Sequence, residues 1–164
     1  MEVGLEKKAA ADAIVAAKKF VTFKLGTEEF GVDVMQIREI SGMVDITRVP
    51  RATSYVDGVI NLRGRITPII NLRKRFGFEP KEPGPSTRIV IAELDEHLIG
   101  IIVDEVTDVL GIAMENIDPT PELVTTEVSK EYLKGIGKVG EKRLIILLDM
   151  NKVVSKEAFI STET

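Results

Sequence analysis

Cysteine and tryptophan are absent from the 164 residues, and histidine occurs once. Without cysteine the chain has no disulfide framework, no thiolate nucleophile and no zinc–thiolate site. No apolar run is long enough to cross a bilayer, and Asp12, Lys18 and Lys19 interrupt the Ala-rich start, unlike the core of a signal peptide. The formal net charge of −4 argues against a nucleic-acid partner, which needs a basic surface. We therefore expect a cytoplasmic protein that does not insert into membranes.

Aromatic residues are also scarce. They make up 5% of the chain, although 44% of it is hydrophobic, so the core must consist mainly of Ile, Val and Leu. Branched side chains favour strands, because they pack well on a pleated surface. Short apolar segments joined by Gly- and Asp-containing turns predict β-barrels or a sandwich rather than a parallel sheet.

The sequence offers no recognisable set of catalytic residues. His97 follows Glu96 in an expected strand, so we interpret it as an ordinary strand residue rather than a base or metal ligand. Asp104 and Asp108 could share one helical face, but no second acidic cluster accompanies them, so a solvated acidic face is expected. The glycines at 135–140 do not open a helix, as a phosphate-binding loop would. We expect no enzyme activity, no cofactor and no metal.

The most informative segment is Gly58–Arg73. It predicts a strand, a tight turn at Arg63–Gly64, a second strand, and a short helix over 72–76 capped by Asn71. Arg63 at the tip is either a recognition residue, since a guanidinium can bind a carboxylate through two hydrogen bonds, or a solubilising charge. The spacing alone leaves both interpretations open.

Alternating residues upstream predict a strand from Phe20, a hairpin turn, and a second strand that runs from Phe30 to Ile40. Val34, Ile37 and Ile40 recur every three residues. This spacing fits a stripe buried in the core or an exposed apolar patch offered to a partner, and the sequence does not choose between them.

A proline-rich segment, 79–86, interrupts the pattern, which then restarts at Arg88. The later segment Gly135–Met150 repeats the first hairpin, with Asp149 in the place of Asn71. We interpret this as an internal duplication that produces two subdomains with a boundary near 79–87.

Each subdomain is too short to bury a full core alone, so the two are expected to pack against each other and to leave a groove between them. The folded unit is expected to span residues 20–155. We expect residues 1–19 to form a flexible N-terminal tail and residues 156–164 to form a C-terminal tail.

Four segments, Phe23–Ile40, Gly58–Arg73, Gly100–Val106 and Tyr132–Gly137, occur in an order that resembles the bacterial chemotaxis coupling proteins of the CheW family. The resemblance covers Phe20 to about Ser155. It implies a mainly β fold of two five-stranded SH3-like β-barrels packed side by side, with short helices.

The resemblance also implies a function. CheW-like proteins are non-enzymatic cytoplasmic adaptors that couple the histidine kinase CheA to the cytoplasmic tips of chemoreceptors in signalling arrays. By position, the residues implied for the receptor-binding surface are Arg63, Glu39, Gly58, Gly100, Val106 and Val109. Those implied for the kinase-binding surface are Val34, Ile37 and Val21, and Ile37 lies close to both surfaces.

Two alternatives stay open. The chain could be a CheW-like domain of a CheV-type or CheA-type protein, although a receiver domain or kinase core is not expected within 164 residues. It could also be a β-barrel protein that binds a small ligand in the groove between its barrels.

Overall fold

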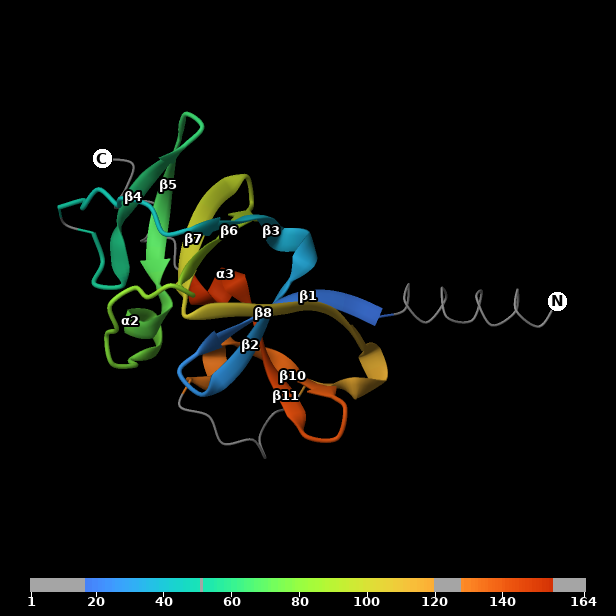
Figure 1. Cartoon of the computed structure of the whole chain (residues 1–164). Coiled ribbons are helices and arrows are strands. Elements are labelled where there is room, and N and C mark those ends of the chain that lie inside the picture. The colour runs from blue at the N-terminus through green and yellow to red at the C-terminus, as the bar shows by residue number, and fades with distance from the viewer. Residues whose placement is uncertain (1–16, 51, 120–127, 155–164) are drawn as a thin grey trace.

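Strands form where branched apolar residues alternate with polar ones, and turns rich in glycine or polar residues separate them. The computed structural model describes residues 17–50, 52–119 and 128–154, which form two sheets (Figure 1). We call the first sheet barrel A; its strands, in spatial order, are β8 (Glu105–Ala113), β1 (Ala17–Leu25), β2 (Glu28–Asp33), β11 (Arg143–Leu148), β10 (Leu133–Val139) and β9 (Ile117–Asp118). We call the second sheet barrel B; its strands are β3 (Ile37–Gly42), β6 (Arg88–Leu94), β7 (His97–Val103), β5 (Arg65–Asn71) and β4 (Val56–Leu62).

Short helices connect or follow these strands. Those in the described part of the chain are the α-helices α2 (Leu72–Phe76) and α3 (Met150–Val153) and the 3₁₀ turns η1 (Val34–Gln36), η2 (Met114–Asn116) and η4 (Lys130–Tyr132). The side-chain oxygen of Asn71 accepts a hydrogen bond from the Lys74 N–H at 3.2 Å, and Asp149 accepts one from the Asn151 N–H at 3.1 Å. Each side chain satisfies a backbone donor at a helix start, so the capping role predicted for Asn71 is confirmed.

The prediction of two five-stranded barrels is confirmed, with the two-residue strand β9 added to barrel A. The order β8-β1-β2-β11-β10 in barrel A corresponds to β3-β6-β7-β5-β4 in barrel B. Each order contains one parallel pair, β2–β11 in barrel A and β5–β7 in barrel B. This correspondence supports the internal duplication.

The two barrels do not coincide with the two halves of the chain. Barrel B takes the consecutive strands β3 to β7, whereas barrel A combines β1 and β2 with β8 to β11. The predicted boundary near 79–87 is therefore wrong, because this segment joins α2 to β6 within barrel B. The first hairpin of each copy pairs with strands of the other copy, and the chain passes between the barrels at η1 and at Asp104.

Asp33 marks the first crossing between the barrels. Its carboxylate accepts a hydrogen bond from the Met35 N–H at 2.9 Å and caps η1. The continuous strand predicted from Phe30 to Ile40 is therefore wrong, because the Asp33 side chain offers the backbone a local partner in place of a neighbouring strand.

The first strand begins earlier than expected. β1 starts at Ala17 rather than at Phe20, because β8 provides antiparallel partners for Ala17, Lys18 and Lys19. The rest of the predicted N-terminal tail and the predicted tail at 156–164 lie outside the described residues.

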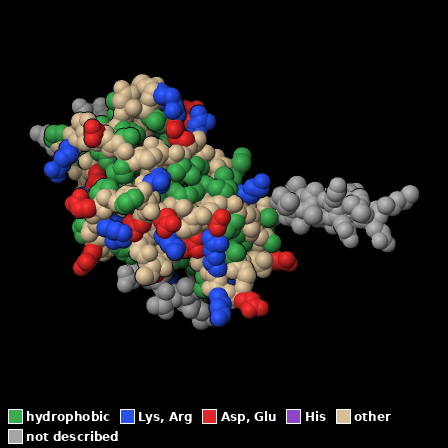
Figure 2. Space-filling model, in the orientation of Figure 1, with side chains coloured by type: hydrophobic (Ala, Val, Ile, Leu, Met, Phe, Trp, Pro, Cys, Tyr) green, Lys and Arg blue, Asp and Glu red, His purple; other side chains and the backbone are tan. Residues whose placement is uncertain are grey.

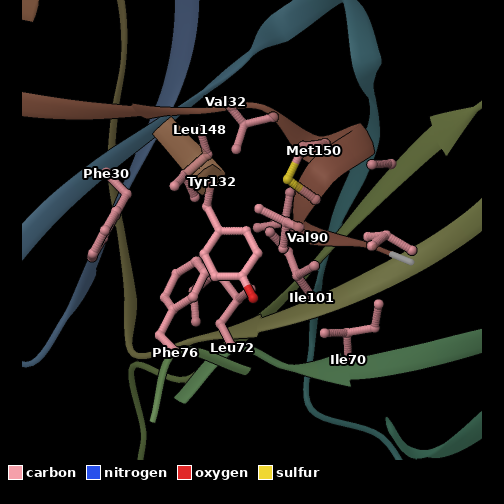
Figure 3. Packing of buried hydrophobic residues seen from close by; sticks show 14 of the residues in the cluster. Phe30, Val32, Ile70, Leu72, Phe76, Val90, Ile101, Tyr132, Leu148 and Met150 are labelled. Carbon is pink, nitrogen blue, oxygen red and sulfur yellow. The ribbon is translucent and has the colours of Figure 1, made fainter. Parts of the chain in front are cut away.

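The largest buried cluster lies between the two barrels (Figure 3). Its side chains come from both sheets and include Phe30, Val32, Leu148, Ile70, Val90 and Ile101. A smaller cluster around Ile145 fills barrel A, and another around Ile69 fills barrel B. Fully burying one such side chain contributes about 1.5–3 kcal/mol, so the shared cluster binds the barrels into one body. The expected packing of one subdomain against the other is confirmed.

Candidate functional site

Arg63 and Gly64 form the two-residue turn between β4 and β5. Both have positive φ angles, 50° and 88°, which is the backbone conformation that such hairpin turns require. Asn61 accepts a hydrogen bond from the Gly64 N–H at 2.7 Å and holds the turn in place. The side chain of Arg63 is 75% exposed. The predicted position of Arg63 at the tip of a tight turn is confirmed.

The structure brings Arg63 together with Glu39, although 24 positions separate them in the sequence. The Arg63 guanidinium donates a hydrogen bond to the carboxylate of Glu39, which lies on β3. An exposed ion pair of this kind contributes about 0–1 kcal/mol to stability, so breaking it costs the fold little. A carboxylate on a partner could therefore replace Glu39 at the guanidinium.

A β-bulge interrupts each of the strands β3 and β8. Arg38 is the extra residue on β3, and Thr107 is the extra residue on β8. In a regular strand, residues three apart point to opposite faces, but one inserted residue returns them to the same face. The bulges therefore explain the three-residue spacing that the sequence left ambiguous.

The bulges place two pairs of apolar residues on the strand faces that adjoin the largest buried cluster, which lies between the barrels. Ile37 and Val106 are half-buried and pack against that cluster, one from each barrel. Ile40 and Val109 lie on the same two faces, and Val109 is 58% exposed. Hydrophobic side chains gather near the centre of the view in Figure 2, over the region of β3. We define the seam patch as the six residues Val34, Met35, Ile37, Ile40, Val106 and Val109.

Three residues predicted for the partner-binding surfaces are not available to a partner. Val21 is only 2% exposed, so its predicted place on the kinase-binding surface is wrong. Gly100 lies inside barrel B, where an added Cβ would be 2.6 Å from Ile69 Cδ1. Gly58 is buried beneath Thr47, whose carbonyl oxygen would be 2.1 Å from an added Cβ. Strand alternation could not place Val21, because β1 packs apolar residues on both faces.

Asp104, at the second crossing, connects the barrels through its side chain. Its two carboxylate oxygens accept hydrogen bonds from Arg73 at 2.9 Å and 2.5 Å, and one of them also accepts from the Gly26 N–H at 2.8 Å. The expected solvated acidic face is therefore wrong: Asp104 is only 16% exposed, and Asp108 lies on a strand. Sequence spacing could not reveal Arg73 as the partner.

The electrostatic surroundings of Asp104 favour its charged form. Burial raises the pKa of this carboxyl. The hydrogen bonds from Arg73 and the Gly26 N–H, together with the positive charges of Arg73 and Lys81, lower it by more than burial raises it. The net pKa lies below its ordinary value. Asp104 thus remains ionised at neutral pH and holds α2 against barrel A.

A second arginine of α2 strengthens the same connection. The Arg75 guanidinium lies 4.4 Å from the centroid of the Tyr55 ring and 4.8 Å from that of Tyr132. Its Nε also donates a hydrogen bond to the Val153 carbonyl at 2.7 Å. Tyr55 precedes β4 in barrel B, whereas Tyr132 precedes β10 in barrel A. Arg75 therefore ties the two barrels together.

The rival hypothesis of a ligand pocket between the barrels is not supported, because apolar side chains fill that region (Figure 3). A hollow of about 790 Å³ lies on barrel B and is lined in part by Val49, Thr53 and Lys74. A smaller one of about 400 Å³ lies at the surface where the β1–β2 turn of barrel A meets α2, lined in part by Gly26, Arg73 and Phe78. Within the described ranges, no group of acidic or histidine side chains could hold a metal ion. The helices of this part of the chain are all too short or too polar to cross a membrane.

Comparison with known proteins assigns the two-barrel body to a family. A family model described as a CheW-like domain matches residues 19–158. The chemotaxis protein CheW of Klebsiella aerogenes is 39% identical over 140 residues, covering 85% of this chain and 83% of that protein. CheW of Bacillus subtilis is 37% identical over 147 residues, covering 88% and 92%. The scaffolding protein TtCheW of Thermoanaerobacter tengcongensis has a solved structure that matches with a TM-score of 0.78, at 35% identity, covering 87% and 95%.

Proposed function

Because the chain belongs to the CheW-like family, it is a chemotaxis adaptor, and we propose that it couples the histidine kinase CheA to the cytoplasmic tips of chemoreceptors. Membership of this scaffold family implies interaction with chemotaxis signalling components. We assign no catalytic step to the chain. It would act in the cytoplasm and join membrane receptor arrays only through its partners.

The exposed Arg63–Glu39 pair is the observation that carries this proposal. Barrel A contains a counterpart of this ion pair, in which Arg143 of β11 contacts Asp108 of β8 at 3.1 Å. Arg143 is half-buried and also bonds to Glu29, whose side chain is only 12% exposed. Arg63 has a single carboxylate partner among the described residues and reaches into solvent. The pair in barrel B is therefore suited to exchanging partners, whereas the pair in barrel A is suited to holding the fold.

We assign the receptor-binding role to Arg63, Glu39 and the part of the seam patch on β8, namely the half-buried Val106 and the exposed Val109. Gly58 and Gly100 would support this surface only through the fold, because each is buried. Val34 and Ile37 would contact the kinase, and Ile37 adjoins both surfaces. Val21 would act only from the interior.

Rigidity is what lets an adaptor transmit a change from one partner to another. The shared apolar cluster, the Arg73–Asp104 pair and the Arg75 contacts fix the angle between the barrels. A rearrangement at the receptor surface would then reach the kinase surface instead of being absorbed by motion between the barrels.

Replacing Arg63 by Ala is expected to weaken binding to a chemoreceptor cytoplasmic fragment roughly thirtyfold, because a central interface arginine contributes about 2 kcal/mol. Calorimetric titration of the purified proteins would measure the affinity. The stability should change by less than about 1 kcal/mol, since the lost ion pair is exposed.

Arg65→Ala is the matched control, because Arg65 lies on the same hairpin and is also exposed. Its side chain donates to the Glu96 carbonyl at 2.8 Å rather than to Glu39. Equal receptor affinity for folded Arg63→Ala and the unchanged protein would refute the assignment.

Replacing Val34 by Asp is expected to lower the affinity for the regulatory domain of CheA at least about tenfold, because a charge would enter an apolar contact without a partner. Receptor affinity should be retained. Val44→Asp, at an exposed valine outside the seam patch, provides the control. If both variants bind the kinase equally well, the kinase surface lies elsewhere.

A further inference from the structure

The bulge on β8 is held by hydrogen bonds from within barrel A. Thr107, its extra residue, donates to Glu29 Oε2 at 2.6 Å. Because Thr107 gives its only hydroxyl proton to Glu29, the Thr22 hydroxyl donates to Thr107 across 2.7 Å, with the Asp108 carbonyl oxygen 3.3 Å away as a weaker alternative acceptor. Thr22 is fully buried. The polar groups of this bulge therefore face partners inside the barrel.

Glu29 is itself held in place by Arg143. The guanidinium donates to both carboxylate oxygens, at 2.9 Å and 2.6 Å, and one of its nitrogens also contacts Asp108 at 3.1 Å. Glu29 is only 12% exposed. The hydrogen bond from Arg143 lowers the pKa of the Glu29 carboxyl; burial opposes this effect, and the Thr107 hydroxyl adds to it. Glu29 therefore remains an ionised acceptor for Thr107.

The corresponding bulge in barrel B is held only by exposed ion pairs among the described residues, including the one between Arg63 and the neighbouring Glu39. Its extra residue, Arg38, forms an exposed ion pair with Glu93 at 3.3 Å. An exposed pair holds backbone geometry weakly, whereas a shielded bidentate pair to a carboxylate imposes direction as well as charge. The difference indicates that the shape of β8 is fixed more firmly than that of β3.

The bulge decides where the outer valines of β8 point. Val106 lies opposite Phe23 and Val109 opposite Val21, on one face of β1. If Thr107 took a regular place in the pairing, the residues beyond it would change face, and Val109 would leave the side shared with Val106.

We propose that Glu29 and Arg143 are positioning residues for the receptor-binding surface: by holding Thr107 in the bulge, they keep Val106 and Val109 on the same face. This inference rests on the proposed function. Neither positioning residue needs to touch the receptor, since both act through Thr107.

The test compares Thr107→Val, which replaces the hydroxyl by a methyl group of similar size, with Thr107→Ser, which keeps the hydroxyl. We expect Thr107→Val and Arg143→Met each to bind the receptor fragment at least tenfold more weakly, while Thr107→Ser stays within about threefold of the unchanged protein. Affinity for the kinase regulatory domain should change less than twofold in all three. Lys74→Gln, which breaks an exposed ion pair elsewhere in barrel B, should leave both affinities unchanged.

Amide hydrogen exchange separates a local positioning role from a general loss of stability. In Thr107→Val and Arg143→Met, amides of β8 should exchange at least tenfold faster, while those of β6 and β7 keep their rates. Uniform acceleration across both barrels would overturn the inference, as would normal receptor binding by Thr107→Val. If the unchanged protein fails to bind the receptor fragment, the proposed function fails, and the inference that depends on it fails too.

Discussion

Replacing Asp104 by Ala is expected to lower the free energy of unfolding by about 3 kcal/mol, the largest effect of any single charged residue described above. The change leaves the Arg73 guanidinium without its carboxylate and the Gly26 N–H without its acceptor, in a position only 16% exposed. For a domain of this size, the melting temperature should fall by about 8 °C, which differential scanning calorimetry would show.

Lys74→Ala serves as the control, because its ion pair with Asp57 is more exposed and should contribute less than about 1 kcal/mol. The pH dependence gives a second check. The folded-state pKa of Asp104 lies below the ordinary pKa of an aspartate, which it has in the unfolded chain. The stabilisation is therefore complete when the pH is above that ordinary pKa, and it is lost as the pH falls through the folded-state pKa. Asp104→Asn should therefore lose less stability on acidification than the unchanged protein. Equal acid sensitivity would contradict the assigned role.

Replacing Gly58 by Ala should cost about 3 kcal/mol of unfolding free energy, which chemical denaturation would measure. Its φ of 151° is rarely adopted by residues with a side chain. The new methyl would meet the Thr47 carbonyl, which accepts a hydrogen bond from the Val59 N–H at 2.8 Å. The strand β4 and the segment paired with it would have to separate.

Gly42→Ala is the matched control, since nothing lies within 4 Å of its added Cβ. Its stability should stay within about 1 kcal/mol of the unchanged protein. Because Gly58 is buried, any loss of receptor binding by Gly58→Ala should scale with the loss of folded protein. A fully stable Gly58→Ala protein with impaired binding would instead show that this residue is part of the contact surface.

The local parts of the fold could be predicted from the sequence because their causes are local. The Arg63–Gly64 turn depends on residues that tolerate positive φ, and the start of α2 depends on the side chain of Asn71. The three-residue spacing of Ile37 and Ile40 could be noticed in the sequence, but only the strand register shows that an inserted residue produces it.

The long-range pairings could not be predicted in the same way. Equivalent strands of a duplicated chain carry similar apolar patterns, so β1 and β6 offer almost the same partners to β3 and β8. Val21 was placed on the kinase-binding surface by position in the family resemblance, and alternation could not correct this, because it cannot separate an inward valine from an outward one in a strand that is apolar on both faces. The bridges from Arg73 to Asp104 and from Arg143 to Glu29 depend on where the strands meet.

The exchange of hairpins between the barrels has a consequence for how the chain is made. Barrel B is one uninterrupted run, so its strands can pair while the ribosome is still adding later residues. Barrel A cannot close until β11 has emerged to lie parallel to β2, which was synthesised at the start. Until then the edge of β2 that will pair with β11 stays open, although β1 already has β2 and β8 as neighbours, so the nascent adaptor carries an unpaired strand edge prone to aggregation until β11 emerges.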